Sequence, residues 1–567
     1  MSISQSRSQS HTPSDHSRYD VVVLGSGPAG QRAAIASVKS GRRTLMVEKR
    51  PVVGGTCINT GTIPSKSFRE AVVYLSGYRE HAIYGESYAV KREITMDDLN
   101  ARASYVMKCE RDIIQAQAYR NGIDMLYGAA SFVDPHTVMI CLADDCGTRT
   151  ISAQTIVIAT GSEVAQVGDI EFDEEHILNS DSILTMSDIP RTLTVVGAGV
   201  IGVEYASMFA ALGTRVTLVD ARPDLLSFVD HEIADELAHY LRSQWVTLRL
   251  GEELTSCAIL PDGHVKTTLA SGKVIVTEKT LHAIGRNGAT EDLNLAAAGL
   301  EADKRGKLTV NEHYQTAVPH IYAVGDVVGF PALASTSMAQ GRIAASHAAH
   351  VAFNPMPEVF PYGIYSVPEI SMVGRTEEDL THANVPYEVG KAYYRHVARG
   401  QIIGDSVGML KIIFCPKTHK IYGVHIIGEN ASELVHTGQA VMALGGTVDY
   451  FVDAVVNYPT LSELYKIAAH NGLNRVAGAS ADGLADLPAT KLAPAEKRET
   501  AAAEKQAVDT ADTKEQHGAA TPKEQGATAI HGMAPVEEHE GATAEEHGVP
   551  TAELVSAASG KNGKKGR

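Results

Sequence analysis

The 567-residue sequence lacks the features that mark several classes of protein. No run approaches the roughly 20 consecutive apolar residues of a transmembrane helix, so we expect no membrane span. Six cysteines are scattered too sparsely for a disulfide scaffold, and neither a C-x-x-C pair nor an H-E-x-x-H motif occurs, so we predict no metal centre. Positive charge is also scarce, because the formal net charge is −17 and no basic stripe is present, which argues against nucleic acid as a partner. These absences favour an acidic globular protein of a reducing compartment, and we expect the cytoplasm.

The two ends of the chain differ in composition from the rest. Residues 1–18 form a serine-rich leader that we expect to be disordered, with an organelle transit peptide as the weaker alternative. Residues 477–567 contain no Phe, Trp or Tyr and are dominated by Ala, Glu, Lys, Gly and Thr. Such a segment cannot bury enough apolar surface to offset its ordering entropy, so we predict a disordered tail. The chemistry is therefore expected within residues 19–476.

A strand–turn–helix–strand unit begins at Tyr19 with the run YDVVVLGSGPAGQRAAIASVKSGRRTLMVEKR. Its glycines Gly25, Gly27 and Gly30 follow an apolar strand in a G-x-G-x-x-G pattern. The first glycine of such a pattern permits a tight turn, the second admits a pyrophosphate, and the third allows close helix–strand packing. Glu48 ends the second strand, where it can accept hydrogen bonds from a ribose. The unit predicts a bound dinucleotide.

The same pattern occurs a second time, in the run TLTVVGAGVIGVEYASMFAALGTRVTLVDARPDLL. Gly197, Gly199 and Gly202 follow a strand, and Asp220 closes the next one. Two separate dinucleotide units in one chain indicate two ligands bound at once, as electron transfer between cofactors requires.

The acid of the second unit is followed by a basic residue. Asp220 favours the free 2′-hydroxyl of NAD(H), whereas Arg222, two residues later, could pair with the 2′-phosphate of NADP(H). A surface arginine in a loop is an equally weighted alternative. If Arg222 does line the pocket, one site could accept both nicotinamide nucleotides in turn.

Three further runs, TIVIATGS (155–162), HAIGRN (282–287) and YAVGDV (322–327), accompany the two glycine units. This arrangement resembles the two-dinucleotide flavoprotein reductases, which include dihydrolipoamide dehydrogenase and glutathione reductase. The resemblance implies an α/β fold with two Rossmann-like domains, for FAD and NAD(P), and a C-terminal α+β dimerisation domain that builds a homodimer or a higher homo-oligomer. The implied boundaries are the leader 1–18, the FAD-binding domain in two parts (19–162 and 282–352), the NAD(P)-binding domain 163–281, the dimerisation domain 353–476 and the tail 477–567.

The resemblance also implies the site residues. Lys66 and Glu204 match the family's ion pair beside flavin N5, where positive charge favours the reduced flavin, and they are the predicted catalytic residues. The other positions implied for FAD are Gly25, Gly27, Pro28, Ala29, Gly30, Glu48, Lys49, Gly55, Thr56, Cys57, Thr62, Ala130, Thr160, Gly161, Gly325, Asp326 and Ala334. Those implied for NAD(H) and NADP(H) are Gly197, Gly199, Val200, Ile201, Gly202, Asp220, Ala221, Arg222, Gly285 and Arg286.

Two departures from the disulfide reductases affect the same half-reaction. These enzymes carry a second cysteine five residues after the first, but here Thr62 stands five residues after Cys57 in GGTCINTGTIPSK. They also carry an acid–base histidine before a Pro-Thr pair, but here Tyr458 precedes it in NYPTLSE (457–463), although Glu463 remains. Tyrosine, with a reference pKa of about 10, is a poor base at neutral pH. We therefore expect Cys57 to be a packing residue rather than a nucleophile.

The flavin half of the site is thus retained while the dithiol half is lost. This combination is similar to a transhydrogenase branch of the family, and it implies hydride transfer from NADPH to FAD and then to NAD⁺. The alternatives are an FAD-dependent NAD(P)H reductase that uses a quinone, a metal ion or another small acceptor, and a non-catalytic nucleotide-sensing protein. The expected partners are small-molecule nucleotides.

Overall fold

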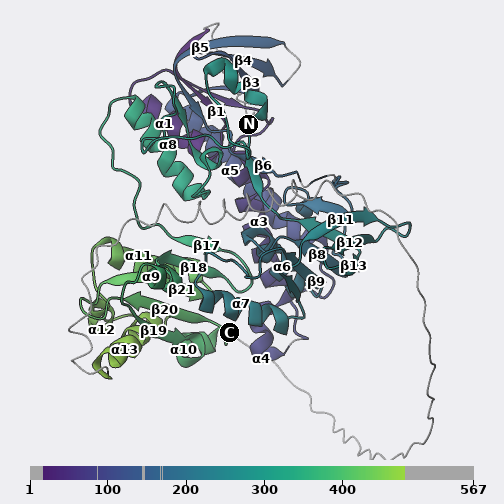
Figure 1. Cartoon of the computed structure of the whole chain (residues 1–567), viewed down its shortest axis with the longest axis vertical. Coiled ribbons are helices and arrows are strands. Elements are labelled where there is room, and N and C mark those ends of the chain that lie inside the picture. The colour runs from purple at the N-terminus through teal and green to yellow at the C-terminus, as the bar shows by residue number, and fades with distance from the viewer. Residues whose placement is uncertain (1–16, 86, 144–146, 167, 169, 479–567) are drawn as a thin grey trace, which may run out of the picture. The chain divides into compact units, whose positions relative to one another are not determined.

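The computed structural model describes residues 17–478, except residues 86, 144–146, 167 and 169. Figure 1 labels the helices and strands of this part of the chain. The predicted disordered tail lies outside the described residues, apart from Ala477 and Gly478, which end the last helix. Residues 1–16 of the predicted leader lie outside them too, whereas Arg18 begins the first strand.

The first sheet carries the first glycine unit. Its parallel part has the order β3-β2-β1-β5-β16, and β4 pairs antiparallel with the extensions of β3 and β5. The buried run of valines in β1 explains why this strand lies in the interior of a parallel sheet, because such a strand is covered by other elements on both faces. The strands are β1 (Arg18–Leu24), β2 (Thr44–Glu48), β3 (Asp124–Asp134), β4 (Thr137–Leu142), β5 (Thr148–Ile158) and β16 (Ile321–Ala323).

Helices α1 and α8 pack closely in this domain. A Cβ atom added at Gly341 of α8 would lie 2.1 Å from the carbonyl oxygen of Ala29 in α1, so only glycine allows this contact. Between β2 and β3 the chain forms several helices, and the second of these carries Lys66. The helices of this region are α1 (Pro28–Lys39), α2 (Gly55–Asn59), α3 (Thr62–Ser76), η1 (Tyr78–Glu80), α4 (His81–Tyr84), α5 (Met96–Asn121), η3 (Glu291–Leu293), η4 (Leu295–Ala298), η5 (Gly325–Val328) and α8 (Ala334–Ala348).

The second glycine unit lies in a separate parallel sheet of order β10-β9-β8-β14-β7. A three-stranded antiparallel sheet, β11-β12-β13, is inserted before β14. The elements are β7 (Ile177–Asn179), η2 (Ile183–Thr185), β8 (Thr192–Val196), α6 (Val200–Ala211), β9 (Arg215–Asp220), α7 (His231–Ser243), β10 (Thr247–Leu250), β11 (Leu254–Ile259), β12 (Val265–Leu269), β13 (Val274–Thr277) and β14 (Lys279–His282). The connections between the two parallel sheets pair as β6 (Ser162–Val164) with β15 (Arg286–Gly288).

The C-terminal part is an antiparallel sheet of order β17-β18-β21-β20-β19 with helices packed against it. Its strands are β17 (Tyr362–Ile364), β18 (Ile370–Gly374), β19 (Glu388–Tyr393), β20 (Met409–Phe414) and β21 (Ile421–Ile427). Its helices are α9 (Glu377–His382), η6 (Tyr394–His396), α10 (Ala398–Ile402), α11 (Ala431–Ala443), α12 (Asp449–Asp453) and α13 (Glu463–Gly478). The predicted fold class, two Rossmann-like domains followed by an α+β domain, is confirmed.

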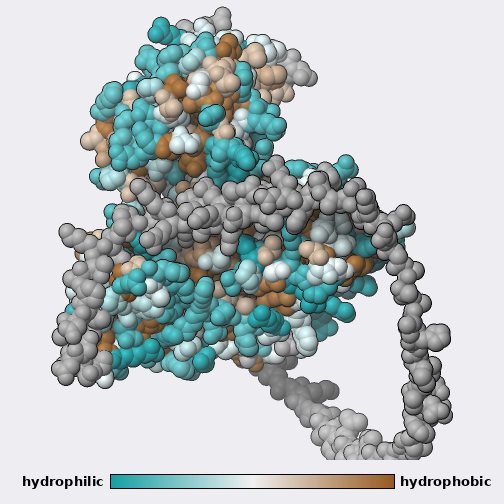
Figure 2. All heavy atoms as spheres, in the orientation of Figure 1, coloured by the Kyte–Doolittle hydropathy of each residue, from teal (hydrophilic) through white to brown (hydrophobic). Residues whose placement is uncertain are grey.

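The surface of the described part is mixed in character. Hydrophilic and hydrophobic side chains are interspersed over the face drawn in Figure 2. Among the described residues, no helix combines the length and the apolar composition needed to cross a bilayer.

Candidate active site

The first glycine turn leaves open space at the start of α1. Gly25 has φ +109°, and a Cβ there would lie 2.3 Å from the carbonyl oxygen of Ala159. At Gly30 a Cβ would lie 2.0 Å from the Gly25 carbonyl oxygen, whereas at Gly27 it would meet no atom within 4 Å. Gly25 and Gly30 therefore close the turn, and Gly27 faces open space at a helix N-terminus, where an anion is favoured.

Glu48 closes this turn by accepting three hydrogen bonds. Its Oε2 accepts from the Ser26 amide at 3.0 Å and the Ser26 hydroxyl at 2.5 Å, and its Oε1 accepts from the Arg50 amide at 2.9 Å. A carboxylate has about four acceptor positions, so one remains for a ribose hydroxyl.

The residues around the first turn fit a bound FAD. Thr160 has a buried hydroxyl with no hydrogen-bond partner among the described residues, as does Thr60. Gly161 has φ +74° and no atom within 4 Å of an added Cβ. Buried polar atoms are rarely left unpaired, so a ligand bound here would satisfy Thr160.

Lys66 and Glu204 form a close ion pair, as the resemblance implies. The Lys66 ammonium, on α3, donates to Glu204 Oε2 on α6 at 2.7 Å. The Lys66 side chain is 25% exposed, whereas that of Glu204 is only 4% exposed. Helix α6 also carries the second glycine turn at its start, so the ion pair connects α3 to the helix of the second cradle. The role of the pair beside a flavin remains a prediction.

Cys57 and Thr62 lie together at the junction of α2 and α3. The thiol hydrogen-bonds with the Thr62 hydroxyl, and Cys57 is partly buried in a small apolar cluster with Ile58 and Ile114. Burial raises the pKa of Cys57, and this outweighs the opposite effect of the hydrogen bond from Thr62. The protonated thiol at neutral pH is a poor nucleophile.

The second glycine turn repeats the geometry of the first. Gly197 has φ +106°, and a Cβ on Gly202 would lie 1.8 Å from its carbonyl oxygen. At Gly199, whose position is equivalent to that of Gly27, an added Cβ would meet only the Arg222 guanidinium, at 3.9 Å. The open side of this cradle is therefore bordered by Arg222.

Asp220 and Arg222 form a two-point ion pair at this cradle. Oδ1 accepts from Arg222 Nε at 3.0 Å, and Oδ2 accepts from Nη2 at 2.8 Å and from the Ala198 amide at 2.6 Å. Burial alone would raise the pKa of Asp220, but the hydrogen bonds from Arg222 and Ala198 lower it below its usual value. The Arg222 side chain remains 41% exposed, so it can also meet a ligand.

Arg286 is held in a network of hydrogen bonds and an ion pair rather than standing free. Its guanidinium donates to the Ser162 hydroxyl at 3.0 Å, the Ser162 carbonyl at 2.9 Å and Asp181 at 2.9 Å. The Ser162 hydroxyl in turn donates to Asp326 at 2.9 Å. Sequence reasoning missed Ser162 and Asp181, because neither belongs to a glycine pattern.

The remaining predicted positions border the cradles to different degrees. Pro28, Ala29, Val200 and Ile201 begin α1 and α6, Thr56 and Gly55 begin α2, Ala334 begins α8 and Gly325 begins η5. Lys49 is exposed and paired with Asp292 at 2.5 Å, Ala130 lies within β3, Gly285 precedes β15, and Ala221 is exposed after β9.

The second departure, Tyr458, lies at the surface of the C-terminal part and is 75% exposed in the single chain. Glu463 begins α13, and its buried Oε2 has no hydrogen-bond partner among the described residues. Both lie in the domain that the sequence predicts to dimerise.

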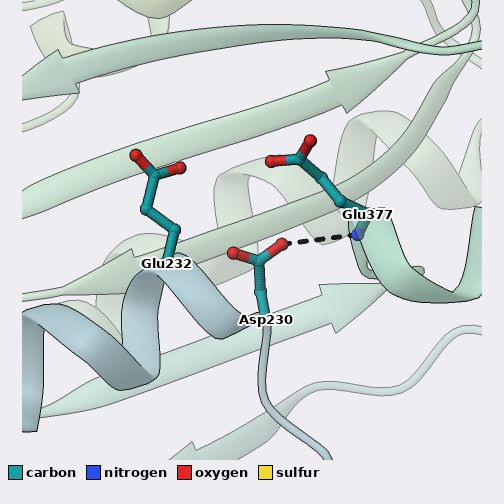
Figure 3. A group of neighbouring side chains, drawn as sticks. All are labelled: Asp230, Glu232 and Glu377. Atoms are coloured by element: carbon teal, nitrogen blue, oxygen red, sulfur yellow. Dashed lines mark hydrogen bonds between the residues drawn. The ribbon is translucent and has the colours of Figure 1, made fainter. Parts of the chain in front are cut away.

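One group of carboxylates among the described residues has metal-ligating geometry: Asp230, Glu232 and Glu377 (Figure 3). Lys411 supplies positive charge there, because its buried ammonium donates to Asp230 at 2.7 Å, lies 3.1 Å from Glu232 and pairs with Glu377. Burial alone would lower the pKa of Lys411, but Asp230 and Glu377 raise it above its usual value. The group is an internal ion-pair network between α7 and the C-terminal sheet.

Comparisons with known proteins agree with this arrangement. A model of the pyridine nucleotide-disulphide oxidoreductase family matches residues 19–341, and a model of its dimerisation domain matches residues 360–469. The soluble pyridine nucleotide transhydrogenase of Mycobacterium tuberculosis (strain ATCC 25177 / H37Ra) is 52% identical over 461 residues, which are 81% of this chain and 98% of the relative. The enzyme of the same name from Escherichia coli (strain SMS-3-5 / SECEC) is 44% identical over 462 residues, with the same coverage of 81% and 98%.

Solved structures show the same fold. LpdA from Mycobacterium tuberculosis matches with a TM-score of 0.73 at 26% identity, covering 80% of this chain and 99% of LpdA. The HOCl-induced flavoprotein disulfide reductase RclA from Escherichia coli matches with a TM-score of 0.71 at 26% identity, with the same coverage. With two glycine cradles and family matches over most of its described length, the chain belongs to the pyridine nucleotide-disulphide oxidoreductase family.

Proposed function

We propose that this protein is an FAD-dependent pyridine nucleotide transhydrogenase that transfers hydride from NADPH to NAD⁺. The observation that carries the proposal is the Lys66–Glu204 pair, which is intact beside a thiol whose partner position holds Thr62. The names of the relatives at 44–52% identity support the same activity over a quinone or metal reductase.

FAD, when bound, supplies the hydride-accepting and hydride-donating chemistry. The chain supplies the site that holds it: the open Gly27 turn for the pyrophosphate, Glu48 for the ribose, and the unpaired Thr160 hydroxyl. Lys66 contributes a positive charge that Glu204 holds in place at 2.7 Å. Such a charge stabilises electron-rich groups in a site that excludes water.

The thiol positions supply no outlet for electrons. Thr62 cannot form a disulfide, and the raised pKa of Cys57 keeps its sulfur protonated at neutral pH. No acid–base group is needed for hydride exchange between nicotinamides, which is why Tyr458 can replace a histidine.

A single nicotinamide cradle serves both nucleotides in this proposal. Both Asp220 oxygens are engaged by Arg222 and the Ala198 amide, so in this proposal the Arg222 guanidinium moves away in either case. Its departure frees Asp220 to accept from the ribose of NAD(H), and lets Arg222 meet the 2′-phosphate of NADP(H). Because the two nucleotides compete for one place, the first must leave before the second binds.

We also propose the assembly and location of the protein. The matched dimerisation domain supports a homodimer, in which Tyr458 and Glu463 line the interface. The scarcity of cysteine and the two nucleotide substrates favour the cytoplasm. The boundaries 19–162, 163–281, 282–352 and 353–476 remain the proposed domain limits.

The proposal is tested with purified protein and two acceptors. The flavin spectrum is recorded first, and NADPH is then supplied anaerobically with either the thio-analogue of NAD⁺ or lipoamide. We expect the thio-analogue to be reduced and lipoamide to be left unreduced. A bound flavin that NADPH reduces without any transfer to the thio-analogue would overturn the proposal.

A further inference from the structure

A turn of the C-terminal sheet contacts both helices that carry the ion pair. Residues 365–369, here named the clamp turn, connect β17 to β18. They lie far in sequence from Lys66 on α3 and from Glu204 on α6, yet the structure brings all three segments together. Neither glycine unit requires this contact.

The clamp turn holds Glu204 through the backbone. The Tyr365 amide donates to Glu204 Oε1 at 2.8 Å, while Lys66 occupies Oε2 at 2.7 Å. Both carboxylate oxygens are thus engaged, which fixes the plane of the carboxylate. Two residues further on, the Val367 amide donates to the Ser207 hydroxyl of α6 at 2.9 Å, which gives the turn a second attachment to the same helix.

The ring of Tyr365 meets the other member of the pair. The Lys66 ammonium lies 5.0 Å from the ring centroid, within the range of a cation–π contact. The ammonium also donates to the Ser65 hydroxyl at 3.3 Å. The side chain of Lys66 is partly exposed and flexible by nature, so the ring restricts where the ammonium can lie.

Arg69 ties the same turn to α3. Its side chain is 2% exposed, its Nε donates to the Ser366 carbonyl at 2.9 Å, and its Nη1 lies 3.1 Å from Glu369. Glu369 also accepts from the Ser432 hydroxyl at 2.8 Å. Arg69 stands one helical turn after Lys66, so it anchors α3 to the clamp turn close to the ion pair. Helix α6 is anchored to the same turn through Glu204 and Ser207.

We infer that Tyr365 is a positioning residue for hydride transfer: its amide fixes Glu204 and its ring confines the Lys66 ammonium, so that the C-terminal domain sets the geometry of the ion pair. The inference rests on the proposed function only where it concerns the reaction. The confinement of Lys66 by Tyr365 is a property of the protein that can be measured without turnover.

The test compares Tyr365→Leu with Tyr365→Phe in the flavin-loaded protein. Tyr362→Leu is the matched control, because it removes a tyrosine ring from the same hairpin where it packs on Phe228 instead of Lys66. Lysines are reductively methylated with ¹³C-formaldehyde, and the Lys66 signal is assigned by its loss in Lys66→Arg. We expect the aromatic ring to shift the Lys66 methyl signal upfield in the wild type and in Tyr365→Phe. The shift should be lost in Tyr365→Leu and kept in Tyr362→Leu.

A second readout follows the reaction. Stopped-flow reduction of the flavin by NADPH should slow about tenfold or more in Tyr365→Leu, because small misplacements in a site are costly, and should stay within about twofold in Tyr365→Phe. Ser207→Ala, which removes the acceptor of the Val367 amide, should displace the Lys66 signal in the same direction as Tyr365→Leu.

The outcomes separate the two proposals. An unchanged Lys66 signal in both Tyr365→Leu and Ser207→Ala would overturn the inference, even if the wild type transfers hydride to NAD⁺. A signal that depends on Tyr365 in a protein that transfers no hydride would leave Tyr365 holding Lys66 and would overturn the proposed function alone.

Discussion

Single residues decide which acceptors the flavin of this protein can serve. Thr62 places a hydroxyl beside the Cys57 thiol, so Cys57 has no second sulfur with which to form a disulfide. Burial also raises the pKa of the Cys57 thiol. Lys66 and Glu204 are retained at 2.7 Å. The protein thus retains the ion pair that we propose for hydride transfer, while the second thiol of a disulfide reductase is missing.

The Asp220–Arg222 pair predicts a measurable change in nucleotide preference. In Arg222→Ala we expect the KM for NADPH to rise about tenfold or more, with the KM for NADH nearly unchanged, because a charge-assisted contact to the 2′-phosphate is lost. In Asp220→Asn we expect the KM for NADH to rise and the KM for NADPH to stay nearly unchanged, since the ribose loses an acceptor and Arg222 is released. Reductase rates with each nucleotide and a dye acceptor measure both effects. Equal KM changes for the two nucleotides in Arg222→Ala would contradict this role.

His282 predicts a loss of stability in acid. It is buried at the end of β14, and neither ring nitrogen has a hydrogen-bond partner among the described residues. Burial lowers its pKa from 6.5 to about 4, so the unfolded chain binds more protons than the folded chain between these values. The free energy of unfolding therefore keeps the full contribution of neutral His282 above pH 6.5, and it falls by about 3 kcal/mol as the pH drops from 6.5 through 4.

The variant His282→Leu removes this titration. The difference between its free energy of unfolding and that of the wild type, measured by urea denaturation, should grow in favour of the variant from pH 7 to pH 4.5. A difference that does not change with pH would show that His282 is not a source of acid sensitivity.

Elements differ in how far their sequence predicts them. The two strand–turn–helix units could be predicted because local sterics demand their glycines: a Cβ on Gly30 or Gly202 would overlap a carbonyl oxygen. The clamp turn could not be predicted, because Tyr365 is far in sequence from Lys66 and Glu204 and meets them only through the tertiary fold. The ion-pair network of Lys411 is likewise invisible in the sequence, since its three carboxylates come from two distant segments.

The network between α7 and β20 predicts an uneven response to the loss of two lysines. Lys411→Met should lower the free energy of unfolding by about 3–5 kcal/mol, because it leaves the fully buried Asp230 without its cation. Lys391→Met is the matched control, since Lys391 pairs with the more exposed Glu232 and should cost about 1 kcal/mol or less. Urea denaturation at pH 7 measures both. Similar losses in the two variants would contradict the importance of burial here.

The C-terminal domain leaves apolar side chains uncovered in the single chain. Leu444 is 88% exposed and Val455 is 98% exposed, and both lie within the range that matches the dimerisation domain. Val455→Asp should therefore weaken a homodimer about tenfold or more, because a charge would enter an apolar contact. Trp245→Asp, at an 86% exposed position outside that range, should not. Sedimentation velocity over a range of concentrations separates these results, and equal dimer fractions in the two variants would contradict the predicted interface.

In the proposed enzyme, one nicotinamide cradle serves NADPH and NAD⁺ in turn through a single bound FAD. Initial rates measured while NADPH and the thio-analogue of NAD⁺ are varied together test it most directly. If one nucleotide must leave before the other binds, double-reciprocal plots will be parallel, and high NADPH will inhibit in competition with the thio-analogue. Intersecting lines, which require both nucleotides to be bound at once, would rule out a single shared cradle.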